Sequence, residues 1–255
     1  MDRRSNVRIH IVADAAQMAE EGARFFAERA ADAIATRGVF RVALSGGSTP
    51  RALYGRLAAP IASASPPVDW PHVHLFFGDE RHVPPDHADS NYRMVKEALL
   101  SHAPIPDANV HRIRGEAPDA AEAADAYAQE IKTAFHLVPG AWPRFDLVLL
   151  GMGPDGHTAS LFPDTPVLHE RSRIAAAVWV VSMQTWRVTL TPPVLNHART
   201  VLFLVSGSDK AETLHAVLDG PPAPDNLPSQ LIVPTEGTTH WLVDTAAAAR
   251  LNPRS

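Results

Sequence analysis

Residues 40–57 read FRVALSGGSTPRALYGRL and contain an apolar run, a glycine-rich turn and a helical pattern in direct succession. The apolar run Phe40–Leu44 predicts a buried strand, and Pro50–Leu57, with proline at an early position, predicts a helix. A strand that leads through a glycine-rich turn into a helix is a common phosphate-binding unit of α/β folds. This stretch therefore predicts the fold class and a place for a phosphorylated ligand.

The turn between this strand and this helix consists of small and hydroxylated residues. Gly46 and Gly47 have no side chains, so backbone N–H groups can approach an anion closely. Ser48 and Thr49 add hydroxyl donors, and the start of the helix adds a favourable dipole. A purely structural turn is the alternative, because a lone glycine-rich pattern is weak evidence. The turn lacks the lysine of a P-loop and dinucleotide-binding spacing, which favours a monophosphate over a nucleotide.

A second glycine-rich turn, GMGPDGH at Gly151–His157, follows the run FDLVLL at Phe145–Leu150. The run is apolar enough for a central parallel strand. The turn places Asp155 two residues before His157, so a carboxylate stands beside an imidazole that can exchange protons near neutral pH. We interpret this turn as the chemically active one, although most of the 13 histidines are expected at the surface or at helix caps.

Composition limits the function classes. The chain has 255 residues, of which 45% are hydrophobic, and a net charge of -5 at pH 7, so no overall positive field attracts nucleic acid or anionic lipid. The absence of cysteine excludes disulfides, thiolate catalysis and thiolate metal ligands. Residues 1–11 contain no apolar core of signal-peptide length, and no stretch is long enough to span a bilayer. We expect a cytoplasmic protein, as a monomer or small homo-oligomer.

Strand-like and helical patterns alternate along the chain. The predicted strands are Val7–Val12, Phe40–Leu44, Val73–Phe77, Asp146–Leu150, Ala177–Val181, Thr200–Val205 and His240–Val243. The predicted helices are Asp14–Thr36, Pro50–Leu57, Ser90–Leu100, Asp119–Phe135 and Lys210–Leu218. The alternation predicts a single-domain α/β fold over residues 1–255, with a mainly parallel, doubly wound, Rossmann-like sheet and helices on both faces. The proline-rich stretches 59–67 and 220–224 are interpreted as surface loops.

Ionisable residues also follow the third predicted strand, where the sequence is GDERHVPP at Gly78–Pro85. A polar loop with an internal ion pair is one reading, but the position at a strand end favours a functional role for Asp79 and Arg81. Ser90 and Asn91 suit a helix cap better than a ligand role.

Lys210 closes the turn SGSDK at Ser206–Lys210, where its ammonium group could reach a phosphate. A metal site could be drawn among the histidines of residues 72–87, but no regular ligand spacing supports one. No metal or organic cofactor is expected.

Taken in order, these segments closely resemble the 6-phosphogluconolactonase family, within the wider glucosamine-6-phosphate isomerase superfamily. The matching motifs are LSGGSTP (Leu44–Pro50), GDERHVP (Gly78–Pro84), Ser90-Asn91, GMGPDGHTASLFP (Gly151–Pro163) and RVTLT (Arg187–Thr191). Five ordered motifs over nearly the whole chain are far more specific than any one of them. The family usually has a proline-rich approach to the last motif, whereas this chain has Ser182–Trp186, SMQTW.

The resemblance implies hydrolysis of a phosphorylated δ-lactone of the pentose phosphate pathway. It implies His157 as the general base, and it implies a phosphate site formed by Ser45, Gly46, Gly47, Ser48, Arg187 and Lys210. Asp155 would orient His157 and stabilise its charged form. Arg81 is our candidate for stabilising the oxyanion, and we expect Asp79 to organise Arg81 and bound water.

Two alternatives stay open. A deaminase or isomerase of the same superfamily would share the phosphate turn, but in those enzymes the segment after the histidine resembles Ala-Phe-Asn-Glu. This chain has Ala-Ser-Leu-Phe at residues 159–162, and Arg81 where the deaminases typically carry an aromatic residue. A non-catalytic sugar-phosphate sensor would normally carry an appended DNA-binding domain; none is evident, and the net charge is unfavourable for it.

Overall fold

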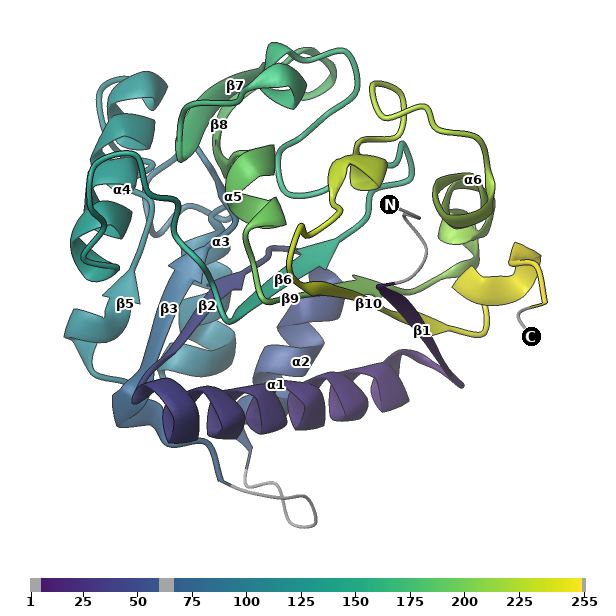
Figure 1. Ribbon diagram of the computed structural model, residues 1–255, viewed down its shortest axis with the longest axis horizontal. Helices are drawn as coiled ribbons and strands as arrows, with labels where there is room; N and C mark the ends of the chain where they lie inside the picture. The colour runs from purple at the N-terminus through teal and green to yellow at the C-terminus, as the bar shows by residue number, and fades with distance from the viewer. Residues whose placement is uncertain (1–5, 60–66, 254–255) are drawn as a thin grey trace.

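The computed structural model describes residues 6–59 and 67–253 and has a seven-stranded central sheet (Figure 1). The strands, in spatial order, are β1 (Val7–Val12), β10 (Thr238–Asp244), β9 (Thr200–Val205), β6 (Leu147–Gly151), β2 (Phe40–Leu44), β3 (Val73–Phe77) and β5 (Val110–His111). Every neighbouring pair in this sheet is parallel. The predicted fold class, an α/β fold with a mainly parallel sheet, is confirmed.

Helices cover both faces of the sheet. Figure 1 shows α1 (Ala15–Arg37) and α2 (Ser48–Ala58) below it, and α4 (Ala120–Ala134), α5 (Pro192–Asn196) and α6 (Ala211–Asp219) above it. A Cβ atom at Gly22 would lie 2.5 Å from Leu53 Cδ1, so this glycine lets α1 and α2 pack closely. Because both faces are covered, the central strands are apolar throughout, and all six residues of β9 are buried.

A second, smaller sheet is antiparallel and contains β4 (Asp79–Arg81), β8 (Thr185–Leu190) and β7 (Ala175–Val180), in the order β4-β8-β7. The strand predicted at Ala177–Val181 forms as β7, but it lies outside the main sheet. The reason is its connection to β8: the tip of this hairpin is a 3₁₀ turn at Val181–Met183 followed by Gln184, which is too short for a parallel crossover.

Several predicted boundaries move. The helix expected from Pro50 begins at Ser48, because Gly47, with φ of 104°, occupies the N-cap position. The helix expected at Ser90–Leu100 is α-helical only at α3 (Asn91–Val95) and continues as a π-helical turn at Lys96–Leu100. The loop predicted at residues 220–224 forms, whereas most of the loop predicted at residues 59–67 lies outside the described residues.

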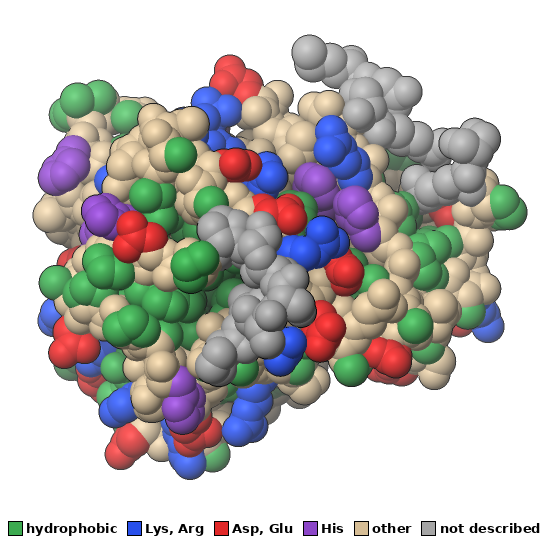
Figure 2. Space-filling view, turned by 90° about the horizontal axis from the view of Figure 1, so that it is seen from below, with side chains coloured by type: hydrophobic (Ala, Val, Ile, Leu, Met, Phe, Trp, Pro, Cys, Tyr) green, Lys and Arg blue, Asp and Glu red, His purple; other side chains and the backbone are tan. Residues whose placement is uncertain are grey.

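Charges are mixed on the face that α1 and α2 cover. Figure 2 shows acidic and basic side chains interspersed there, and neither sign forms a continuous field. In residues 6–59 and 67–253, no helix is both long and apolar enough to cross a membrane.

Candidate active site

The topology of the main sheet places the site. From β2 the chain proceeds through β3 to β5 at one edge, and from β6 it proceeds through β9 to β10 toward the other edge. The order therefore reverses between β2 and β6, and open α/β sheets bind ligands beyond the carboxyl ends of the strands at such a point. Both glycine-rich turns follow these two strands.

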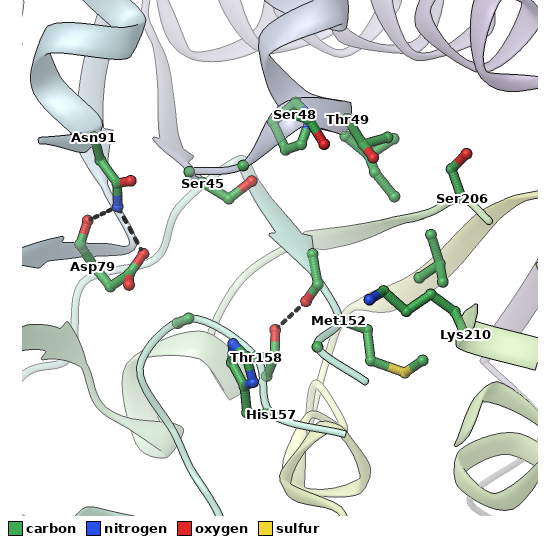
Figure 3. A pocket seen from close by; sticks show the side chains of 18 of the residues that line it. Ser45, Ser48, Thr49, Asp79, Asn91, Met152, His157, Thr158, Ser206 and Lys210 are labelled. Atoms are coloured by element: carbon green, nitrogen blue, oxygen red, sulfur yellow. Dashed lines mark hydrogen bonds between the residues drawn. The ribbon is translucent and has the colours of Figure 1, made fainter. Parts of the chain in front are cut away.

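A cavity of about 220 Å³ lies at this point. All the sequence-predicted site residues except Asp155 line it, namely Ser45, Gly46, Gly47, Ser48, Asp79, Arg81, His157, Arg187 and Lys210. Figure 3 shows Ser45, Ser48 and Thr49 across the pocket from His157 and Thr158, with Asp79 and Asn91 on one side and Ser206 and Lys210 on the other. Segments far apart in sequence thus surround one small, polar space.

The side chain of Tyr54 in α2 holds the turn after β2 by hydrogen bonds to its backbone. The Tyr54 hydroxyl donates to Ser45 O at 2.9 Å and accepts from Ser45 N at 3.0 Å. Burial raises the pKa of Tyr54, so its hydroxyl stays neutral and keeps both bonds. The Ser45 Oγ atom is buried without a hydrogen-bond partner among the described residues, so it is available to a ligand.

Gly46 leaves space for a neighbouring side chain. A Cβ atom there would lie 2.0 Å from Asn91 Oδ1, so only glycine lets the turn approach Asn91. The amide of Asn91 in turn donates to Asp79, at 3.0 Å to the main-chain oxygen and 3.2 Å to Oδ1 (Figure 3). Gly46 therefore lets the glycine-rich turn after β2 pack against the side chain that holds the Asp79 carboxylate.

The turn after β6 holds His157 close to Asp155. The Nδ1 atom of His157 lies 2.5 Å from Asp155 Oδ1, and Gly153 N donates to His157 O at 2.9 Å. A Cβ atom at Gly153 would lie 2.1 Å from His157 Nδ1, so glycine is required where the ring passes over the turn. Because a carboxylate only accepts, Nδ1 carries the proton and Nε2 is left with the basic lone pair.

Asp155 is the anionic partner of this pair. Burial would raise the pKa of Asp155, but the hydrogen bond and charge of His157 outweigh burial and hold that pKa below its ordinary value. The carboxylate is therefore ionised at neutral pH and orients the imidazole by accepting from Nδ1.

The ring of Phe162 packs against two of the charged groups. Its centroid lies 4.0 Å from that of the His157 ring, with an angle of 23° between the planes. The guanidinium carbon of Arg187 lies 5.3 Å from the same ring centroid. This apolar ring supports both side chains at the pocket wall and adds a favourable contact with the cation.

Two arginines stand side by side on adjacent strands of the small sheet, since Arg81 of β4 pairs with Arg187 of β8. Burial lowers the pKa of Arg187, Asp79 raises it and Arg81 lowers it further. The guanidinium stays charged even so, because the ordinary pKa of arginine lies far above neutral pH. The Nε atoms of both arginines are buried without a partner among the described residues. Two under-bonded cations that line one pocket favour an anionic ligand or intermediate.

Asp79 differs from its expected arrangement. The expected partner of Asp79 is Arg81, but the cation beside its carboxylate is Arg187, whose Nη1 lies 3.8 Å from Asp79 Oδ2. The hydroxyl of Ser160 donates to the same oxygen at 2.7 Å. Arg81 instead donates to the backbone oxygen of Asp89. Asp79 is thus held by donors on both carboxylate oxygens.

Lys210 enters the pocket from a third turn, which follows β9. Gly207, with φ of 103°, precedes the 3₁₀ turn η6 (Ser208–Lys210). The ammonium group of Lys210 lies 2.7 Å from the exposed carboxylate of Asp209. A phosphate in the pocket would compete with Asp209 for this cation.

Some residues that line the pocket have no recognisable signal in the sequence. Ser90 caps α3, as predicted, by accepting from Arg93 N, but Asn91 lines the pocket and contacts Asp79. Thr158 and Ser206 also line the pocket. No local pattern identifies these three, since each acts through a contact with a distant segment or by its place in the turn.

The histidines of residues 72–87 do not converge. His72 pairs with Asp69, His74 with His111, His82 with the Ala117 carbonyl and His87 with Asp89. Within the described ranges, no group of three His, Asp or Glu side chains could hold a metal ion.

Comparisons with known proteins agree with this geometry. A family model described as glucosamine-6-phosphate isomerases/6-phosphogluconolactonase matches residues 13–241. The 6-phosphogluconolactonase of Homo sapiens is 44% identical, over 90% of this chain and 88% of the human protein. That of Synechocystis sp. is 43% identical, over 88% of this chain and 90% of its own.

The solved structure of 6-phosphogluconolactonase from Trypanosoma brucei superposes with a TM-score of 0.84 at 30% identity, covering 96% of this chain and 98% of that one. The chain belongs to the family of glucosamine-6-phosphate isomerases and 6-phosphogluconolactonases. The resemblance inferred from the sequence motifs is confirmed.

Proposed function

We propose that the protein is a 6-phosphogluconolactonase, which hydrolyses 6-phospho-D-glucono-1,5-lactone to 6-phosphogluconate in the oxidative pentose phosphate pathway. The observation that carries this proposal is the shared pocket. An imidazole oriented by a carboxylate faces the same cavity as a glycine-rich anion turn, two arginines and a lysine. Relatives named 6-phosphogluconolactonase at more than 40% identity support the assignment.

The binding half of the pocket would hold the phosphate. The backbone N–H groups of Gly46 and Gly47 and the hydroxyls of Ser45 and Ser48 approach it from the turn after β2. Arg187 and Lys210 supply the positive charge that the acidic chain lacks overall. Fixing the phosphate in this way orients the lactone ring toward His157.

The chemical half of the pocket would activate water. Nε2 of His157 takes a proton from a water molecule as that water attacks the lactone carbonyl carbon. Negative charge then develops on the carbonyl oxygen, and the guanidinium of Arg81 stabilises it. When the tetrahedral intermediate collapses, the bond from C1 to the ring oxygen breaks, and the imidazolium returns the proton to that oxygen. Asp155 stabilises the imidazolium between these steps.

An amino-sugar phosphate deaminase is the second candidate, and the structure gives one observation against it. Those relatives typically have a glutamate a few residues after the histidine, whereas this chain has Phe162, whose ring stacks on His157. Residues 158–162 therefore contribute no carboxylate beside the imidazole. The cytoplasmic location and the oligomeric state stay predictions.

One experiment separates the candidates. Acid release from freshly prepared 6-phosphogluconolactone is followed at constant pH, with ammonia release from glucosamine 6-phosphate measured in parallel. We expect lactone hydrolysis well above the spontaneous rate, no ammonia release, and poor hydrolysis of unphosphorylated glucono-δ-lactone. Ammonia release without lactone hydrolysis would assign a deaminase, and binding of 6-phosphogluconate without any turnover would assign a sensor.

A further inference from the structure

A buried carboxylate outside the pocket holds the third turn. Asp244 ends β10, which lies parallel to β9 with Val243 opposite Val205, so Asp244 stands beside Ser206. Its side chain accepts hydrogen bonds from the Ser206 hydroxyl, from Gly207 N at 3.1 Å and from Ala247 N at 2.7 Å. The residue is only 5% exposed.

These bonds fix the first two residues of the turn that ends in Lys210. Ser206 and Lys210 line the pocket, whereas Asp244 does not. Gly207 is held at a φ of 103°, a conformation that an L side chain rarely adopts, and its N–H points at the Asp244 carboxylate. The backbone that leads to Lys210 is therefore anchored by a residue that does not line the pocket.

The partners of Asp244 require an acceptor. The Ser206 hydroxyl and the N–H groups of Gly207 and Ala247 all donate to it, and a carboxylate is the side chain that only accepts. Burial raises the pKa of Asp244, but the bonds from Ser206, Ala247 and Gly207 outweigh it and lower that pKa below its ordinary value. Asp244 is thus an anion at neutral pH, with its charge directed at the turn.

We propose that Asp244 is a positioning residue for phosphate binding, which holds the Ser206–Lys210 turn in the conformation that presents Lys210 to the ligand. The proposal rests on the proposed function for the choice of 6-phosphogluconate as the ligand. Binding of this compound can be measured without turnover, so the two proposals can fail separately.

The test compares two buried carboxylates at opposite ends of the sheet. Asp146, which is 6% exposed, precedes β6 at its amino end and accepts from Arg41 N and Arg37 Nε, each at 2.9 Å. Asp146→Ala is therefore a control for the general loss of a buried, hydrogen-bonded carboxylate. Affinity for 6-phosphogluconate is measured by titration calorimetry, and the melting temperature is recorded for each variant.

We expect Asp244→Ala to weaken binding of 6-phosphogluconate about tenfold and Asp244→Asn about threefold, as expected for lost charge-assisted hydrogen bonds. KM should rise in proportion, with kcat within about twofold of wild type. Asp146→Ala should lower the melting temperature and leave the affinity unchanged. In a Ser206→Ala background, Asp244→Ala should cost less affinity than it does alone, because the hydrogen bond between the two side chains is already lost.

Unchanged affinity in Asp244→Ala would overturn the proposal, as would an equal loss in Asp146→Ala. If Asp244→Ala fails to fold, Asp244→Asn gives the same decision at a smaller effect. If Asp244→Ala weakened 6-phosphogluconate binding as expected but the wild-type protein did not hydrolyse the lactone, the proposed function would be overturned and the role of Asp244 would be supported.

Discussion

The turn after β2 and the turn after β6 lie at the carboxyl ends of adjacent strands and share a glycine-rich sequence, yet they differ in charge and in the element to which each leads. The first passes at once into α2 at Ser48 and has no ionisable side chain over residues 45–50. The second leads into a bridge between Thr158 and Leu161 and carries Asp155 and His157. In the proposed function, glycines would let the backbone approach the ligand in both turns, whereas the side chains would assign binding to the first turn and chemistry to the second.

The largest effect should follow from removing the chemistry of the second turn. His157→Ala should lower kcat by about 100- to 10,000-fold, the usual contribution of a general base, because the proposed mechanism uses a single base to take the proton from water. Affinity for 6-phosphogluconate should stay close to wild type, since the first turn is intact. Steady-state kinetics, corrected for spontaneous hydrolysis, and calorimetry measure the two quantities separately.

The same variant can also contradict the proposed division of binding and chemistry between the two turns. A kcat near the wild-type value would exclude His157 as the base and leave the Asp79 carboxylate as the next candidate. Loss of 6-phosphogluconate binding in a folded His157→Ala protein would show that the two turns do not divide binding from chemistry.

The binding half is tested by Arg187, which reaches the pocket from β8. Arg187→Ala should raise KM for the phosphorylated lactone by about 10- to 100-fold with little change in kcat, because the charge-assisted bonds to phosphate are expected in ground and transition states alike. The preference over glucono-δ-lactone should shrink by the same factor. Arg173→Ala, which removes an exposed arginine, serves as the control. A fall in kcat at constant KM would instead place Arg187 at the reacting carbonyl.

The central strands of the main sheet are predictable because they are buried on both faces. The runs at Phe40–Leu44, Val73–Phe77 and Thr200–Val205 form strands with these same bounds. The strands β4 and β5 are too short, at three and two residues, to show a period. The antiparallel pairing of β7 with β8 depends on the tight hairpin tip, which no apolar pattern reveals.

The site divides in the same way. His157 and Asp155 stand together in one turn, so their pairing was visible in the sequence. The contact of Asn91 with Asp79 spans the end of β3 and the start of α3, and its position after Ser90 made a helix cap the natural reading. Asp244 was hidden for a related reason, because a polar residue at the end of an apolar run indicates only where the strand stops.

A smaller effect should follow from weakening the His157 pair without removing the base. Asp155→Asn should lower kcat by less than His157→Ala does, since the imidazolium loses its anionic partner but the base itself remains. Burial raises the pKa of Asp155, but its hydrogen bond to the His157 ring and the charge of that ring outweigh burial and lower this pKa. Because the interaction is mutual, removal of the carboxylate should shift the acid limb of the pH profile to lower pH. A limb that moves to higher pH, or not at all, would contradict the ion pair.

The smallest effect concerns the third turn and has the opposite sign. The Asp209 carboxylate lies 2.7 Å from the Lys210 ammonium group, and this hydrogen bond and charge lower the pKa of Asp209. Asp209→Asn should free the ammonium group and tighten 6-phosphogluconate binding by less than about fivefold, because exposed ion pairs are weak. The gain should shrink at high salt. The control is Asp125→Asn, an equal charge change on α4, which should leave the affinity unchanged. Equal tightening in this control would attribute the gain to net charge. Weaker binding in Asp209→Asn would show instead that Asp209 holds the lysine in place for the phosphate.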